Sequence, residues 1–167
     1  MLRSTAFTAA LGLAAVMTAH AQAAEGVLTE TRHVLSADLA VEAAQAAIAS
    51  CKAQGWNITA SIAERSGAIK ILLVGDGAGG VGRESARRKA YTSALLGVST
   101  DEFAKRLKSG GFDPKVYDPQ MASDAGGVPI KIGNEIIGGI GAAGAPGGDK
   151  DEGCAKAGLA KIADRLK

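Results

Sequence analysis

The side chains that could bind a metal ion or carry out catalysis are few and scattered in this chain of 167 residues. Its only histidines are His20 and His33, and its only cysteines are Cys51 and Cys154. Zinc sites usually take cysteines and histidines at short paired spacings, and no such spacing occurs here. Nucleophilic catalysis needs a nucleophile, a base and a group that orients the base, and the sequence shows no such set. Covalent attachment of haem requires Cys-x-x-Cys-His, which is also absent.

A non-covalent tetrapyrrole site needs less: an apolar slot, one axial ligand and a few cations for the propionates. His33 is the first candidate for the ligand, and the alternative is a solvated histidine just before a helix. Arg87, Arg88 and Lys89 are candidate cations, and the alternative for this run is a solvated helix face. Weaker candidate ligands are Tyr91, Tyr117, Met121 and Lys89.

The pattern Gly-x-Gly-x-x-Gly occurs three times, starting at Gly75, Gly77 and Gly139. A dinucleotide site also needs a parallel βαβ unit with an acidic residue about 20 positions further on. For the first two patterns that position falls near Asp101, within a predicted helix cap. A P-loop would need Gly-Lys followed by Ser or Thr, which is missing. The glycines therefore do not predict a nucleotide site.

The N-terminus predicts export. Arg3 is followed by an apolar run of small residues from Ala6 to Ala19, with small-x-small cleavage sites after it. We expect cleavage after Ala23, which defines a signal peptide at 1–23 and a domain at 24–167. The alternative is an uncleaved anchor, but the run is shorter than the roughly 20 apolar residues of a spanning helix. A periplasmic or secreted protein with no membrane span after processing is expected.

The charge balance argues against nucleic acid as a partner. The chain has 19 basic and 17 acidic side chains, and removal of Arg3 brings it closer to neutrality. Aromatic residues make up 4%, too few for stacking platforms on single strands.

Cys51 and Cys154 are a disulfide candidate in an oxidising compartment. The alternative is two small apolar residues buried under helices. Because both cysteines fall in predicted helices that should pack on the same sheet, a bridge between them is possible in principle.

Apolar periodicity and turn residues define the expected elements. The spacing predicts a helix from Ser36 to about Gly55, and alternation predicts a hairpin over 58–73 around a turn at 65–67. Helices are expected over 84–96 and, after a capping box at Ser99 and Glu102, up to Gly110. A second hairpin is predicted over 128–140 with a two-residue turn at Gly133 and Asn134, and a last helix begins at a capping box of Asp149 and Glu152.

This order predicts an α+β fold in which an antiparallel sheet of about five strands is flanked by helices. Gly138, Gly139 and Gly141 leave the last strand with little side chain. Something must therefore approach this strand closely, either another backbone or a ligand.

Two blocks carry a family resemblance. One is residues 86–94, Ala-Arg-Arg-Lys-Ala-Tyr-Thr-Ser-Ala, and the other runs from Gly126-Gly127-Val128-Pro129-Ile130 through 137–141 to Asp151-Glu152-Gly153-Cys154-Ala155. Together they resemble the GlcG/HbpS family of haem-binding proteins and the C-terminal domain of PduO-type corrinoid adenosyltransferases. The resemblance implies a profilin-like sheet with helices and assembly into homo-oligomers. The sequence departs from the family at 142–144, where Ala-Ala-Gly replaces the frequent Val-Ser-Gly.

These observations lead to two hypotheses. The first is an exported protein that binds haem without a covalent bond and sequesters, buffers or senses it, with no catalytic residues. The second is an enzyme or accessory factor that acts on a small metabolite related to hydroxy acids or corrinoids. For the first, we expect His33 as axial ligand to the metal, near the other cofactor-binding residues: Arg87, Arg88, Lys89, Tyr91, Gly138, Gly139 and Gly141.

Overall fold

The computed structural model describes residues 31–113 and 117–167, so the predicted signal peptide at 1–23 lies outside the described residues. No helix in the described part is long and apolar enough to cross a membrane. The helices are α1 (Ala37–Lys52), α2 (Gly80–Leu96), α3 (Thr100–Lys108) and α4 (Gly148–Ile162), with a 3-10 turn η2 at Ala163–Arg165. The strands are β1 (Thr59–Glu64), β2 (Ile69–Val74), β3 (Gly127–Ile132) and β4 (Glu135–Ala143).

The four strands described form one antiparallel sheet in the order β2-β1-β4-β3. β1 and β4 lie in the centre, with Ile62 opposite Ile140. The α+β class predicted from the sequence is confirmed, and the described residues contain four strands where about five were expected.

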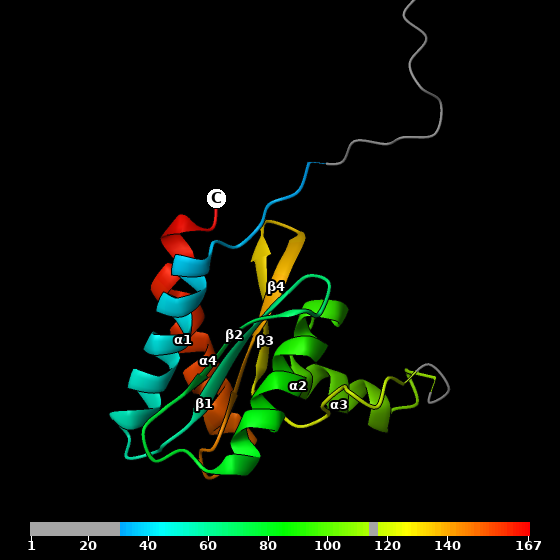
Figure 1. The fold of residues 1–167 in the computed structure, drawn as a ribbon. Helices are drawn as coiled ribbons and strands as arrows, with labels where there is room; N and C mark the ends of the chain where they lie inside the picture. Colours follow the sequence, from blue (N-terminus) through cyan, green and yellow to red (C-terminus); the bar gives the residue numbers. More distant parts are fainter. Residues whose placement is uncertain (1–30, 114–116) are drawn as a thin grey trace, which may run out of the picture. The chain divides into compact units, whose positions relative to one another are not determined.

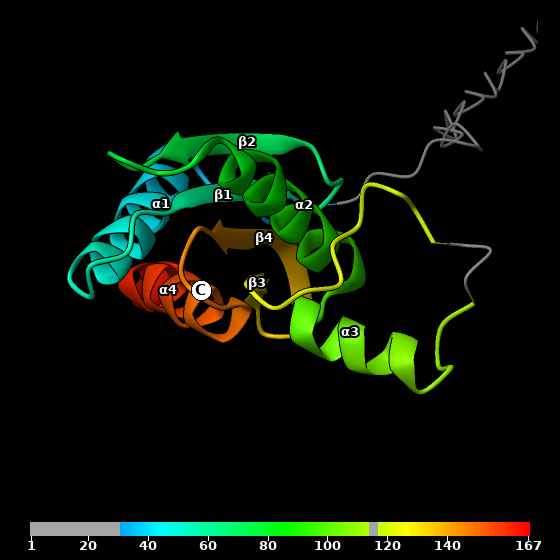
Figure 2. The same ribbon diagram turned by 90° about the horizontal axis from the view of Figure 1, so that it is seen from below.

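Helices cover both faces of the sheet. Figures 1 and 2 show α1 and α4 side by side on one face, and α2 on the other. The main core lies between the sheet and the pair α1 and α4, where Ile62, Ile130 and Ile140 are fully buried. Cys51 of α1 and Cys154 of α4 form a disulfide with their Cα atoms 5.6 Å apart. The bridge therefore fastens the two helices of this face to each other.

The N-termini of the helices agree in part with the sequence-based expectations. The Ser36 hydroxyl accepts the N–H of Leu39 at the start of α1, and the Ser99 hydroxyl caps α3 in the same way. The expected capping box of α4 is not formed, because the N-cap is Gly147 and its first turn carries Asp149 without a side-chain cap. α2 begins at Gly80, earlier than expected, because the glycine loop continues into its first turn.

Candidate functional site

β4 carries glycines in place of larger residues because the backbones of α2 and β1 lie directly against it. A Cβ atom added to Gly139 would lie 2.5 Å from the carbonyl oxygen of Ala90 in α2, and one on Gly141 would clash with the same helix. A Cβ atom on Gly138 would meet the backbone of Ala63 in β1. The sequence left open whether a backbone or a ligand approaches this strand. In the structure it is a backbone, so the space at these glycines is not available to a flat macrocycle.

Lys89 is buried rather than solvated or turned toward a ligand. Its side chain is 2% exposed, and its ammonium lies 3.0 Å from Asp151 Oδ2 and 2.9 Å from Asp124 Oδ2. It also donates to the carbonyl oxygen of Ala142 at 3.2 Å. Burial raises the pKa of Asp151 above its usual value, and the Lys89 ammonium opposes part of this shift. Lys89 thus fastens α2 to β4 and α4.

Other polar residues of α2 hold the segment that precedes β3. Arg88 donates to the backbone carbonyl oxygens of residues 119–121 at 2.6 to 3.2 Å. The Tyr91 hydroxyl donates to Asp118, and this hydrogen bond raises the pKa of Tyr91. Arg87 pairs with a carboxylate of its own helix. These three side chains are therefore engaged by the chain itself.

His33 forms a close pair with Glu135, the first residue of β4. Its Nδ1 atom lies 2.7 Å from Glu135 Oε2, and its backbone N–H donates to Oε1 at 3.2 Å. The hydrogen bonds from His33 lower the pKa of Glu135, so this carboxylate is ionised at neutral pH. Because a carboxylate can only accept, Nδ1 is the ring nitrogen that donates in this pair, and Nε2 is the nitrogen left to bind a metal.

A pocket of about 180 Å³ lies beside this pair. His33 and Val34 line it from the segment before α1, and Ile137 lines it from β4. Glu64 and Arg65, at the turn between β1 and β2, complete the wall together with Arg32 and Ser66. The pocket thus combines an imidazole, apolar side chains and cationic side chains. No group of three or more His, Cys, Asp and Glu side chains that could hold a metal ion occurs among the described residues.

The structure separates the site residues that the sequence placed together. His33 binds Glu135 at the start of β4, whereas Lys89 binds Ala142 near its end. Seven residues of extended strand span roughly 23 Å. His33 and Lys89 therefore cannot contact one ligand within a single chain. Of the predicted site, His33 remains a candidate ligand. Its neighbours Glu135 and Arg65 were not predicted, because their proximity to His33 depends on how the strands pair.

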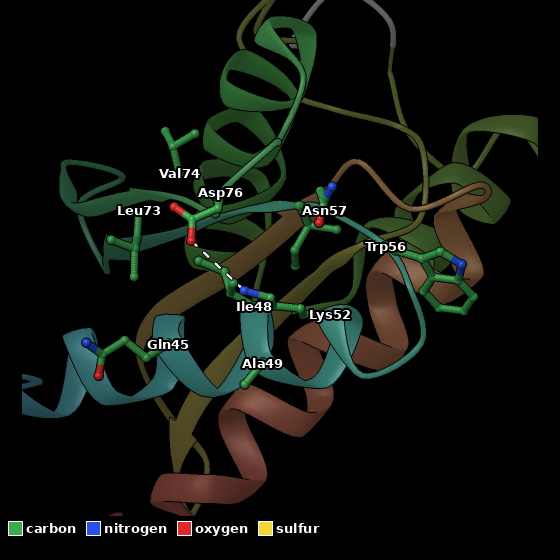
Figure 3. A pocket seen from close by; sticks show the side chains of 11 residues that line it. Gln45, Ile48, Ala49, Lys52, Trp56, Asn57, Leu73, Val74 and Asp76 are labelled. Carbon is green, nitrogen blue, oxygen red and sulfur yellow. Dashed lines mark ion pairs between the residues drawn. The ribbon is translucent and has the colours of Figure 1, made fainter.

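A second, larger pocket of about 270 Å³ lies between α1 and β2 (Figure 3). Ile48, Trp56 and Leu73 supply much of its apolar lining, and Lys52 and Asp76 face each other across it at 4.0 Å. No motif in the sequence indicates this pocket. Its one signal is Trp56, the single tryptophan of the chain, directly after a helix.

An antiparallel sheet with two helices on one face, a glycine-packed helix on the other and a histidine–carboxylate pair at one end defines the class of this protein. The chain belongs to the family described as "Haem degrading protein HbpS-like", whose model matches residues 35–160.

Solved structures agree with this assignment. A double mutant of HbpS from Streptomyces reticuli is 37% identical, with a TM-score of 0.75, and the match covers 86% of this chain and 96% of that one. Protein ORFY from Klebsiella pneumoniae is 18% identical with a TM-score of 0.72, covering 82% and 97% of the two chains. The PduOC–haem complex is 22% identical with a TM-score of 0.70, covering 78% and 96%. No curated protein sequence matches significantly.

Proposed function

We propose that this protein binds haem non-covalently in the pocket beside His33, with Nε2 of His33 as the axial ligand. The observation that carries the proposal is the pair between His33 and Glu135 at the rim of that pocket. A carboxylate on Nδ1 fixes the tautomer, orients the ring and makes Nε2 a stronger ligand. Among the described residues of the predicted site, this imidazole is the one whose second nitrogen is left for a metal.

The other lining residues fit the remaining parts of a tetrapyrrole. Val34 and Ile137 would contact the apolar macrocycle, and Arg65 would pair with a propionate. The pocket is smaller than sites that enclose a whole drug-sized ligand, so it would contact one edge of the ring. When bound, haem would supply iron redox chemistry, and this chain would supply the ligand and its orientation.

Two comparisons support haem as the ligand class. The family description names haem, and the similar PduOC structure is a complex with haem. Sequestration, buffering and sensing are the roles that a binding protein of this kind would serve outside the cytoplasm. We propose them on the basis of the predicted export signal.

Hemin titration of the purified protein tests the proposal. We expect a Soret band that His33→Ala shifts and weakens, because loss of the axial bond changes the electronic state of the iron. Glu135→Gln should weaken binding and shift the band less, since the amide still accepts from Nδ1 but carries no charge. Arg65→Ala should weaken binding without a shift, and Arg106→Ala on α3 serves as the matched surface control.

Three outcomes would count against this assignment. An unchanged spectrum and affinity in His33→Ala would remove His33 as ligand and leave Tyr91 or another residue to be tested. Activity on a hydroxy acid without haem would favour the alternative function. A Soret band that decays in the presence of a reductant, with release of iron, would favour degradation over storage.

Export is a separate part of the proposal. Mass spectrometry of protein recovered from the periplasm or medium should find an N-terminus at Ala24, or at Gln22 if the earlier cleavage site is used. A membrane-bound form that begins at Met1 would contradict it.

A further inference from the structure

The 270 Å³ pocket between α1 and β2 shares no lining residue with the pocket beside His33. Its interior is apolar, because Ile48, Trp56 and Leu73 line it and each of them is only partly buried by the rest of the protein (Figure 3). The volume is slightly below the range of about 300 to 1,000 Å³ for pockets that hold drug-sized molecules. The pocket therefore fits a small ligand with an apolar part.

A tight turn after β2 fixes the backbone of Asp76 at the mouth of this pocket. The Ala78 N–H donates to the Gly75 carbonyl oxygen at 3.0 Å, and Gly77 has a φ of 76°. These are the features of a type II turn with Asp76 as its second residue. A Cβ atom on Gly75 would lie 2.6 Å from the carbonyl oxygen of Ile58, so the turn is packed closely against the chain before β1. The Asp76 carboxylate is therefore presented from a turn of defined geometry.

Lys52 and Asp76 leave each other's charge largely unsatisfied. Lys52 Nζ and Asp76 Oδ2 are 4.0 Å apart, and the two side chains are 66% and 99% exposed. Neither side chain forms a hydrogen bond with another described residue. The side-chain amides of Gln45 and Asn57 also line the pocket, without a hydrogen-bond partner in the described part of the chain. A cation, an anion and two amides are thus available to a ligand at one mouth.

We propose that this pocket binds a free apolar α-amino acid as a zwitterion. The ligand carboxylate pairs with the Lys52 ammonium, its α-ammonium pairs with the Asp76 carboxylate, and its apolar side chain lies between Ile48 and Leu73. A ligand with only one of the two charges would meet a like charge at the mouth without the compensating pair, which gives the site its specificity. Because both protein charges are exposed, each pair contributes little, and we expect a dissociation constant on the order of 1 mM.

The fluorescence of Trp56 tests the proposal, because this residue lines the pocket and is the single tryptophan of the chain. Titration of the purified, haem-free protein with L-leucine should change the tryptophan emission in a saturable way. 3-Methylbutylamine, which is leucine without its carboxylate, and 4-methylpentanoate, which is leucine without its amine, should each bind more weakly. Glycine carries both charges but no apolar side chain, and it should give no saturable change at the same concentrations.

Two variants test which protein charge binds which ligand charge. Lys52→Met keeps the apolar stem and removes the cation, and Asp76→Asn keeps the shape and removes the anion. Each should weaken leucine binding by about threefold to fivefold. Lys52→Met should also lose the preference for leucine over the amine, and Asp76→Asn the preference for leucine over the acid, as in a double-mutant cycle. Lys161→Met is the matched control, because Lys161 is 60% exposed, lies 3.9 Å from a carboxylate and does not line the pocket.

The absence of a saturable response to leucine, at concentrations well above the expected dissociation constant, would overturn the proposal. Binding of the amine or the acid as tight as that of leucine would overturn recognition of a zwitterion. Leucine binding that both charge variants leave unchanged would overturn the assigned pairs. Far-UV circular dichroism of each variant distinguishes loss of the site from loss of the fold. His33→Ala should bind leucine like the wild type, so these results do not depend on haem.

Discussion

Replacement of Lys89 by methionine removes the one positive charge that balances Asp151 inside the protein. Methionine keeps the length and apolar stem of the side chain, so the packing of α2 against β4 and α4 is largely retained. Asp151 is 4% exposed and keeps only the N–H of Ala145 as a hydrogen-bond donor. Removing one partner of a buried pair typically costs about 3 to 5 kcal/mol, and we expect a loss of this size in the free energy of unfolding at pH 7.

The reverse change should be milder because the two partners are not equivalent. In Asp151→Asn the lysine still has Asp124 at 2.9 Å and the carbonyl oxygen of Ala142. Asparagine also keeps an oxygen for the Ala145 N–H. We therefore expect Asp151→Asn to cost less than Lys89→Met, and the double variant to recover part of the loss, which a double-mutant cycle measures. Arg87→Met is the matched control, because it breaks the ion pair with Glu84 near the surface of the same helix. It should change the free energy of unfolding by about 1 kcal/mol or less.

The pH dependence gives a second test of the same reasoning. Without Lys89, the only nearby cation that opposes desolvation of Asp151 is gone, so its folded-state pKa rises further above the unfolded value. A raised carboxyl pKa contributes stability below the unfolded pKa and loses it as pH rises through the folded pKa. The difference in free energy of unfolding between Lys89→Met and wild type, measured in urea, should thus become smaller from pH 7 toward pH 4. A constant gap, or Asp151→Asn costing more than Lys89→Met, would refute this account.

The helix packing and the disulfide give two further predictions. Gly139→Ala should lower the melting temperature sharply because its Cβ has no space against α2, whereas Gly153→Ala, with nothing within 4 Å, should be neutral or slightly stabilising. If both variants melted alike, close packing would not explain the glycine. Replacement of Cys51 and Cys154 by alanine opens a link across 103 residues and should cost about 4 to 5 kcal/mol in the chain-entropy model, measured by urea unfolding. A loss below about 1 kcal/mol would contradict that model here.

Features that depend on a few neighbouring residues could be predicted from the sequence. The caps at Ser36 and Ser99 and the turn at Gly133 are local hydrogen-bond or backbone preferences. The strand that contains Gly139 illustrates the limit. Its composition indicates a close approach, but which segment approaches depends on how α2 packs across the sheet.

Lys89 shows the same limit for charge. Within the run 87–89 it resembled a solvated cation, yet it lies on one helical stripe with the buried residues Ala86, Ala90 and Ser93. That periodicity could have indicated burial, because buried lysines occur almost only when paired. The partner, Asp151, is 62 positions away and could not be identified from spacing.

The packing also explains where a large flat ligand can bind. α1 and α4 fill one face of the sheet with a disulfide-linked layer, and α2 lies against the glycines of the other face. A macrocycle placed on either face would have to displace backbone contacts. This is unfavourable because the protein interior is close-packed. Only the ends and edges of the sheet remain. At one end, His33 and Glu64 line the pocket proposed for the ligand, and Lys70 of β2 binds Glu64 at 2.7 Å, so this wall of the pocket is held by the sheet itself.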